Sequence, residues 1–138
     1  METLNAVEPT PAQIQALMAN APPGPVQMLN LLKFKPQADY GAGSAEPKMT
    51  GQEAYMRYGV EVQKLVGAGG GRVIYQGRAQ HMVIGEVGAM WDAVAVVEYA
   101  SAAAFVQMAL SDDMRKIMHH RKAGLEGQLL IMCTAGVG

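Results

Sequence analysis

The sequence predicts an α+β domain with one four-stranded antiparallel sheet. A strand followed by a helix occurs twice, and each such unit is followed by another strand. The clearest unit is Trp91–Gln107, in which an apolar strand runs through one serine into a helix. The resulting order, strand–helix–strand–strand–helix–strand, is the split βαβ pattern, in which the helices cover one face of the sheet. At 138 residues the chain has the length of one domain.

An extra helix is expected ahead of this unit. Thr10 can cap it, Pro11 suits its first turn, and Gln13 can reach back to the cap. The prolines within residues 21–25 end it. We therefore divide the chain into an N-terminal helix with a proline-rich linker at residues 1–24, one domain at residues 25–134, and a tail at residues 135–138.

The first half of the domain begins with the strand Val26–Phe34, which is almost continuously apolar, as is typical of a strand buried on both faces. The polar segment Gln37–Met49 is a loop. Thr50 and Glu53 form a capping box for the second helix, and the glycine run Gly67–Gly71 ends that helix.

The second half contains three further strands. Arg72–Ala79 is the second strand, and the apolar stretch His81–Ile84 offers a continuation of it. Trp91–Tyr99 is the third strand and Leu125–Thr134 the fourth. Two serines cap the helical segments between the third and fourth strands, Ser101 and Ser111.

The central strands are apolar on both faces. The expected spatial order of the strands is 4-1-3-2, which puts the first and third strands in the centre. The first strand has Met28 and Leu32 at one parity and Leu29 and Leu31 at the other, and the third strand shows the same pattern. Because helices cover only one face, the other face needs a cover too. A second copy of the chain is the simplest cover, so we expect a homodimer through the open sheet face.

Composition excludes several classes of partner. The formal net charge is −1, from 11 basic and 12 acidic residues, without a clustered basic patch. Nucleic acid and anionic membranes are therefore not expected as partners. No apolar run reaches membrane-spanning length, and the first residues lack the pattern of a secretory signal. A single cysteine, Cys133, cannot form an internal disulfide, so we expect a cytoplasmic protein.

Five segments of the chain occur in a recognisable order: Asn30–Phe34, Gly70–Arg72 with Gly77, Trp91-Asp92 followed by Val94–Tyr99, Ser101–Phe105 and Arg121–Leu130. In their order and spacing they resemble the family named domain of unknown function 1330, within the dimeric α/β-barrel (ferredoxin-like) superfamily. The resemblance implies a ferredoxin-like fold, a homodimer that forms a dimeric α/β barrel, and a shared cleft, but no reaction. Related branches include cofactor-free monooxygenases, haem-binding peroxidases and small isomerases.

The chain departs from the family pattern in three places. Ser111-Asp112-Asp113-Met114 stands where the family has Ser-Pro-x-Tyr. The loop Gln37–Met49 and the N-terminal helix look like additions.

Two residues are candidates for acid–base chemistry. His81 is an isolated imidazole in an apolar stretch and is either a structural residue or a general acid or base. Glu98 lies on the third strand and either forms a salt bridge with Lys33 or Arg72 or is a perturbed carboxylate in a cleft.

Three residues are candidates for ligand binding. Asn30 is polar within the most apolar strand, so its amide either bonds across the sheet or the dimer, or faces a cavity. Tyr75 and Trp91 each have an apolar body with a polar tip, and each either packs in the core or lines a pocket.

No metal or cofactor site is expected. The pair His119-His120 cannot chelate from one helical face, because adjacent helical residues point about 100° apart. Cations lie one turn before each of them, Arg115 and Lys116. The glycine run follows a helix and precedes a strand, which is the reverse of a phosphate-binding loop.

The sequence thus predicts a small-molecule-binding protein. Its ligand would be a small apolar organic acid or enol in the dimer cleft, and its reaction, if it has one, a cofactor-independent proton transfer or oxygenation with His81 as base. The alternative is a non-enzymatic ligand sensor or a structural homodimer. A haem protein is a third reading, which would need a histidine inside the pocket.

Overall fold

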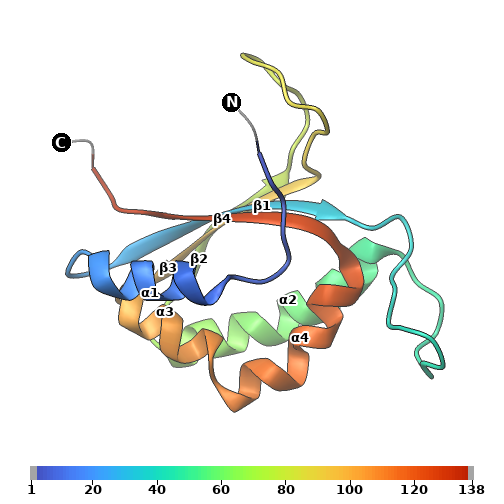
Figure 1. Cartoon of the computed structure of the whole chain (residues 1–138), viewed down its shortest axis with the longest axis horizontal. Coiled ribbons are helices and arrows are strands. Elements are labelled where there is room, and N and C mark those ends of the chain that lie inside the picture. Colours follow the sequence, from blue (N-terminus) through green and yellow to red (C-terminus); the bar gives the residue numbers. More distant parts are fainter. Residues whose placement is uncertain (1–2, 137–138) are drawn as a thin grey trace.

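The computed structural model describes residues 3–136, which form four helices and four strands (Figure 1). The capping boxes predicted at Thr10 and Thr50 are both present, and Ser101 and Ser111 cap the later helices. None of the described helices is both long and apolar enough to span a bilayer. In chain order the elements are α1 (Pro11–Asn20), β1 (Val26–Phe34), α2 (Gly51–Ala68), β2 (Arg72–Arg78), β3 (Ala93–Tyr99), α3 (Ala102–Ala109), α4 (Asp112–Gly124) and β4 (Leu125–Cys133).

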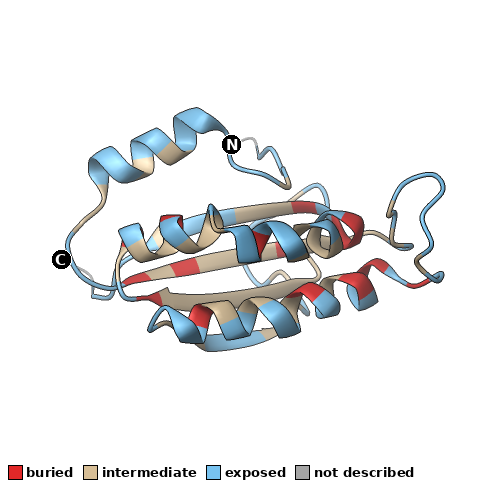
Figure 2. Cartoon of the chain, turned by 90° about the horizontal axis from the view of Figure 1, so that it is seen from below, coloured by how far each residue is buried: buried red, intermediate tan, exposed pale blue. Residues whose placement is uncertain are grey.

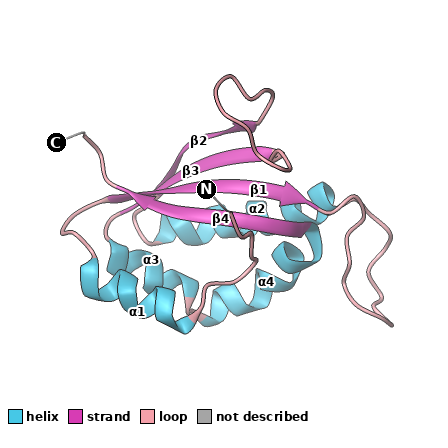
Figure 3. Cartoon of the chain, turned by 45° about the horizontal axis from the view of Figure 1, so that its top comes forward, coloured by secondary structure: helices cyan, strands magenta, loops and turns pink. Residues whose placement is uncertain are grey.

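The four strands form one antiparallel sheet in the order β2-β3-β1-β4 (Figure 3). This is the predicted order read from the opposite edge. All four helices lie on one side of the sheet, with α1 at its margin (Figure 1). The predicted α+β, ferredoxin-like fold with an additional N-terminal helix is therefore confirmed.

The connection between β2 and β3 differs from the prediction. β2 ends at Arg78, so the continuation of this strand through His81–Ile84 is wrong. The last backbone contact between the two segments joins Ala79 N to Asp92 O at 2.9 Å. Beyond this hydrogen bond, no neighbouring strand is present to pair with the backbone N–H and C=O groups of an extended segment. Residues 79–92 instead form a loop that rises from the sheet on the side away from the helices (Figure 1).

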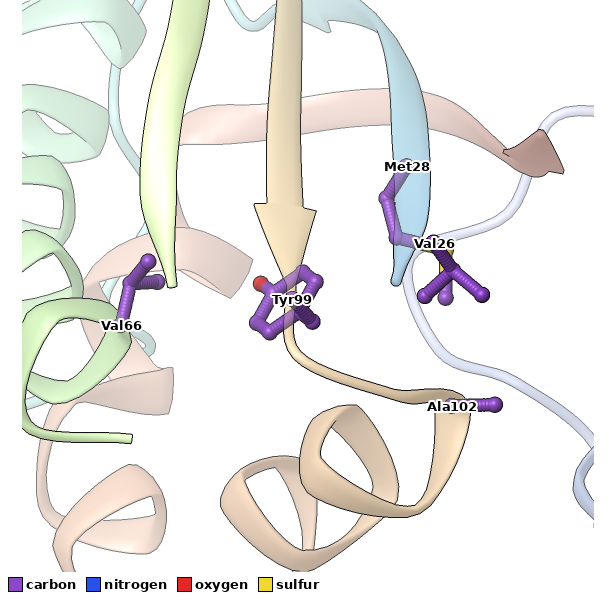
Figure 4. Close-up of a cluster of buried hydrophobic side chains, with 5 residues drawn as sticks. All are labelled: Val26, Met28, Val66, Tyr99 and Ala102. Atoms are coloured by element: carbon purple, nitrogen blue, oxygen red, sulfur yellow. The ribbon is translucent and has the colours of Figure 1, made fainter. Parts of the chain in front are cut away.

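The core lies between the sheet and the helices. Residues paired directly across two strands share a face, so Met28 and Val97 point to the same side, as do Val26 and Tyr99. Figure 2 shows the buried positions gathered where the helices run across the sheet. The central cluster joins β1, β3, α2 and α3 and consists of Val26, Met28, Val66, Tyr99 and Ala102 (Figure 4).

The opposite side, which we call the open face, has no helix over it in the described part of the chain (Figure 3). Its side chains alternate in sequence with those of the core. The apolar ones on the two central strands are only partly buried. They are Leu29, Leu31, Val94 and Val96.

A close approach of two glycines joins α2 to α4. Gly51 is the first residue of α2 and Gly124 the last of α4, and the backbone of Lys35 contacts both, through Lys35 N to Gly124 O at 2.8 Å and Gly51 N to Lys35 O at 3.1 Å. A Cβ at Gly124 would collide with the carbonyl oxygen of Gly51 and lie 2.9 Å from Tyr55 N. Only glycine fits at this junction.

We expect Gly124→Ala to destabilise the protein by about 1–3 kcal/mol, because the added methyl group forces rigid backbones apart. Gly67→Ala is the matched control, since a Cβ at this position of α2 meets nothing within 4 Å. It should raise stability by up to about 1 kcal/mol through helix propensity. Urea-induced unfolding measures both, and equal midpoints for the two variants would contradict the close approach.

Candidate functional site

A cleft of about 800 Å³ opens between α2 and the side of the sheet that faces the helices. We call it the α2 cleft. Its floor is apolar and comes from the sheet, chiefly Leu32, Val73, Ala93, Ala95 and Val97. Its other wall is one side of α2, with Tyr55, Met56, Gly59 and Val60. The volume is that of a typical small-molecule site.

Small residues create this space. Ala93 and Ala95 lie on the floor, and Gly59 faces them from the middle of α2. A Cβ at Gly59 would meet nothing within 4 Å. Glycine inside a helix costs roughly 1 kcal/mol relative to alanine, and at Gly59 it leaves open volume where a side chain would otherwise stand.

Charged groups gather at the end of the cleft where β1 and β2 end and β3 begins, which we call its mouth. Asp92 accepts hydrogen bonds from Lys33 Nζ at 3.3 Å and from Phe34 N at 2.8 Å, so its charge is balanced. Lys35 and Arg78 also line the mouth, and neither forms an ion pair within residues 3–136. Glu126 is the other carboxylate of the lining and is exposed. The mouth therefore holds two cations that are free to attract an anion.

Tyr55 is a polar group of the α2 wall, beside Gln52 and Gln63. Its ring packs against Phe34 and Tyr58, with centroids 5.5 Å away in each case. Burial, and then the neighbouring Tyr58, raise the pKa of the Tyr55 hydroxyl well above its usual range. The hydroxyl therefore stays protonated and can donate a hydrogen bond, but it cannot serve as a base near neutral pH.

Asn30 lies on the helix-facing side of β1 and belongs to a polar network. Its Nδ2 donates to Met28 O at 3.2 Å and to Ala95 O at 3.3 Å. Its Oδ1 accepts from Gln128 Nε2 at 2.8 Å, and Gln128 Oε1 accepts from Arg121 Nη1 at 3.0 Å. Of the alternatives open for Asn30, bonding across the sheet is the one observed.

The two acid–base candidates lie apart from the α2 cleft. His81 is exposed in loop 79–92. Glu98 points to the open face, where it accepts from Arg72 Nε at 2.8 Å and from Gln27 Nε2 at 3.0 Å. The hydrogen bonds from Arg72 and then from Gln27 hold the pKa of Glu98 below its usual range. Arg72 is one of the two partners considered for Glu98 from the sequence.

The two aromatic candidates also lie away from the cleft. Tyr75 pairs with Val96 on the open face, is largely exposed, and its ring leans over Gly77. Trp91 Nε1 donates to Asn5 Oδ1 at 3.0 Å, which ties the N-terminal segment to the start of β3. The five predicted residues thus occupy both sides of the sheet and do not form one site within a single subunit.

A second, smaller hollow of about 410 Å³ lies where loop 35–50 folds against α4. Tyr40 contacts His120 there, with the hydroxyl 2.7 Å from Nδ1, and His119 lines the hollow. Burial, and then the neighbouring His119, lower the pKa of His120. Across residues 3–136, no three histidine, cysteine or acidic side chains come together as a metal site would need.

Sequence reasoning missed the α2 cleft and its residues. Gly59 could have indicated the cleft, because glycine in the interior of a helix is unfavourable and usually has a packing or functional reason. The alternation of small residues at Ala93 and Ala95 was a second signal, since they share one face of a central strand. Arg78 and Lys35 carried no signal of their own, as scattered surface cations are common.

Comparison with known proteins identifies relatives of the whole chain. Two crystal structures of the RPA0582 protein, described as being of unknown function and from Rhodopseudomonas palustris, each superpose with a TM-score of 0.86. The methylated form is 35% identical over 96% of this chain and 96% of its own, and the other form is 34% identical over 98% and 100%. A dabb-family protein with a ferredoxin-like fold from Mesorhizobium loti is 16% identical, with a TM-score of 0.48, over 83% of this chain and 99% of its own.

No curated protein matches the chain. The model of one family, described as a domain of unknown function (DUF1330), matches residues 44–135. This match spans the second helix and all strands after the first, and it confirms the resemblance seen in the sequence. The chain belongs to the DUF1330 family.

Proposed function

We propose that the protein binds a small organic anion with an apolar body in the α2 cleft. One observation carries the proposal: a roomy apolar cleft whose mouth holds two cations without acidic partners, Lys35 and Arg78. The apolar part of such a ligand would lie on the alanine floor, and its acidic group would face the cations. The ligand class, a small apolar organic acid, is the one expected from the sequence. That expectation placed the ligand in a dimer cleft on the open face, whereas the α2 cleft lies on the face that the helices cover.

The exposure of α2 supports the same ligand. Met56 and Val60 line the cleft and are both more than half exposed. Burying such side chains against an apolar ligand contributes roughly 25 cal/mol for each Å² removed from water. The Tyr55 hydroxyl supplies a neutral donor for a polar atom of the ligand, which adds orientation to affinity.

Binding is the part of the predicted function that the cleft supports. Of the described residues that line it, none is a histidine or a cysteine. A catalytic role of His81 or Glu98 stays a prediction. For His81, unchanged turnover of a known substrate by His81→Ala would remove it.

The open face is proposed to be the interface of a homodimer. Its partly buried apolar side chains continue onto the edge strand β4 with Leu129 and Ile131. Loop 79–92 rises on the same side and carries Val83 and Ile84, which are 85% and 88% exposed. One self-complementary contact would remove all of this apolar surface from water, as two-fold interfaces do.

Filling the α2 cleft should abolish binding without harming the fold. Gly59→Leu puts a side chain into the open volume, and it should raise stability because leucine favours a helix over glycine. Gly67→Leu makes the same change on the exposed end of α2, outside the cleft. Calorimetric titration with a panel of aromatic and aliphatic carboxylates, and with their amides, measures binding.

We expect carboxylates to bind the unmodified protein and Gly67→Leu, amides to bind more weakly, and Gly59→Leu to bind neither. A carboxylate that binds Gly59→Leu as tightly as Gly67→Leu would refute the α2 cleft as the site.

Charge on the open face should dissociate the dimer. Ile131 and Leu130 are neighbours on β4 with nearly equal exposure, 45% and 44%, but they point to opposite faces. We expect Ile131→Lys to sediment as a monomer, because a buried unpaired ammonium is costly in an interface. Leu130→Lys should stay a dimer. Equal sedimentation of the two variants would contradict an interface on the open face.

A further inference from the structure

The pairing of β2 with β3 fixes which side chains stand beside the floor of the α2 cleft. Arg78 lies opposite Ala93, and Gln76 lies opposite Ala95. Residues paired directly across two strands share a face, with their Cβ atoms about 5 Å apart, and all four of these residues line the cleft. Each alanine of the floor therefore has one long polar side chain of β2 beside it.

The two polar side chains offer a ligand different contacts. Arg78 is a cation, and none of the ion pairs in the described part of the chain includes it. Gln76 is exposed, and its side-chain amide forms no hydrogen bond within residues 3–136. An amide can both donate and accept. The floor thus has a charged end at Arg78, next to the mouth, and a neutral hydrogen-bonding end at Gln76.

The distance between these two ends suits a single ring. Positions i and i+2 of a strand are about 7 Å apart, which applies to the two alanines and equally to the two polar residues beside them. This spacing is close to the length of a six-membered ring that carries substituents at two opposite positions. Beyond the second alanine stand the larger side chains of Val73 and Val97, which pair with each other and also line the cleft. A longer rigid body would meet these branched side chains.

The walls around this floor favour a flat ring. Gly59 lies across from the alanines, so neither wall carries more than a methyl group there. A planar ring can contact both walls with its two faces, and dispersion attraction is strongest for such close contact. Phe34 and Tyr55 line the mouth end with rings tilted by 47° to each other, and they offer aromatic contacts to the edge of a bound ring.

We propose that the ligand of the α2 cleft is a planar aromatic carboxylic acid with a hydrogen-bonding group opposite the carboxylate on the ring. This inference rests on the proposed function and names the class of its ligand. The ring lies on Ala93 and Ala95 beneath Gly59, and the carboxylate faces Arg78. The group at the opposite position, such as a hydroxyl, bonds to the Gln76 side chain. Gln76 is then the residue that selects among aromatic acids.

A cycle of two ligands and two proteins tests the role of Gln76. Benzoate and 4-hydroxybenzoate differ only in the hydroxyl, and Gln76→Leu removes the amide at similar side-chain size. In calorimetric titrations at neutral pH, we expect the unmodified protein to bind 4-hydroxybenzoate about fivefold more tightly than benzoate, which is the effect of one net hydrogen bond. Gln76→Leu should bind the two acids equally. Cyclohexanecarboxylate, whose ring is puckered, should bind more weakly than benzoate.

Gln80→Leu is the matched control, because Gln80 is exposed and lies outside the lining of the cleft. It should keep the preference of the unmodified protein.

Three results would overturn this inference while leaving the proposed function intact. They are equal binding of benzoate and 4-hydroxybenzoate by the unmodified protein, a preference that survives Gln76→Leu, and cyclohexanecarboxylate that binds as tightly as benzoate. The first and the third need no variant to fold. Failure of every carboxylate to bind would instead overturn the proposed function and this inference together.

Discussion

The central strands of the sheet carry apolar side chains on both faces, while the chain provides helices for only one of them. On the covered face, Val26 and Met28 pack with Tyr99 and residues of α2 and α3 into a buried core. On the open face, Leu29 and Leu31 alternate with them and stay partly exposed. Successive side chains of a strand point to opposite faces of the sheet. Burying one set under the helices therefore leaves the other set on the open face. The need for a cover on the open face follows from the strand geometry.

The face that the helices cover has a packed part and, beside it, the α2 cleft. At one end α2 lies close to the sheet through Val66, and at the other it joins α4 through Gly51 and Gly124. Between these two anchors, Gly59 faces the small side chains of β3, and the α2 cleft results. The helix is therefore fixed at both ends and held away from the sheet in its middle. Such a cleft needs no conformational change to form, as is typical of small-molecule sites, which are largely preformed.

Much of the fold could be predicted from the sequence because its signals are local. The caps at Thr10 and Thr50 are read from residues three positions apart. The two-sided apolar pattern of β1 identified a central strand, and strand order followed from the split βαβ pattern. The end of β2 was not predictable in this way, since His81–Ile84 is apolar enough to be a strand. It is a loop because β3 offers no neighbour for it.

The candidate site was harder to predict, because it depends on which side chains face each other across layers. Asn30 was recognised as unusual, but Gln128, which donates to its Oδ1, and Arg121, which donates to Gln128, both lie more than 90 residues further along the chain. For Glu98 the sequence offered Lys33 and Arg72 as partners, and Arg72, which begins the neighbouring strand, is the one observed. His81 was chosen as an isolated imidazole in an apolar stretch, and Trp91 for its apolar body and polar tip. Neither local property says which side chains of other elements will lie nearby.

The most direct test of the two-faced sheet compares two neighbouring side chains in the unmodified protein. Hydroxyl-radical footprinting gives the labelling rates of Ile131 and Leu130, which a lone subunit exposes almost equally, at 45% and 44%. If a second copy covers the open face, Ile131 should be labelled much more slowly than Leu130, and the difference should vanish on dilution. Equal labelling rates at every protein concentration would contradict the account.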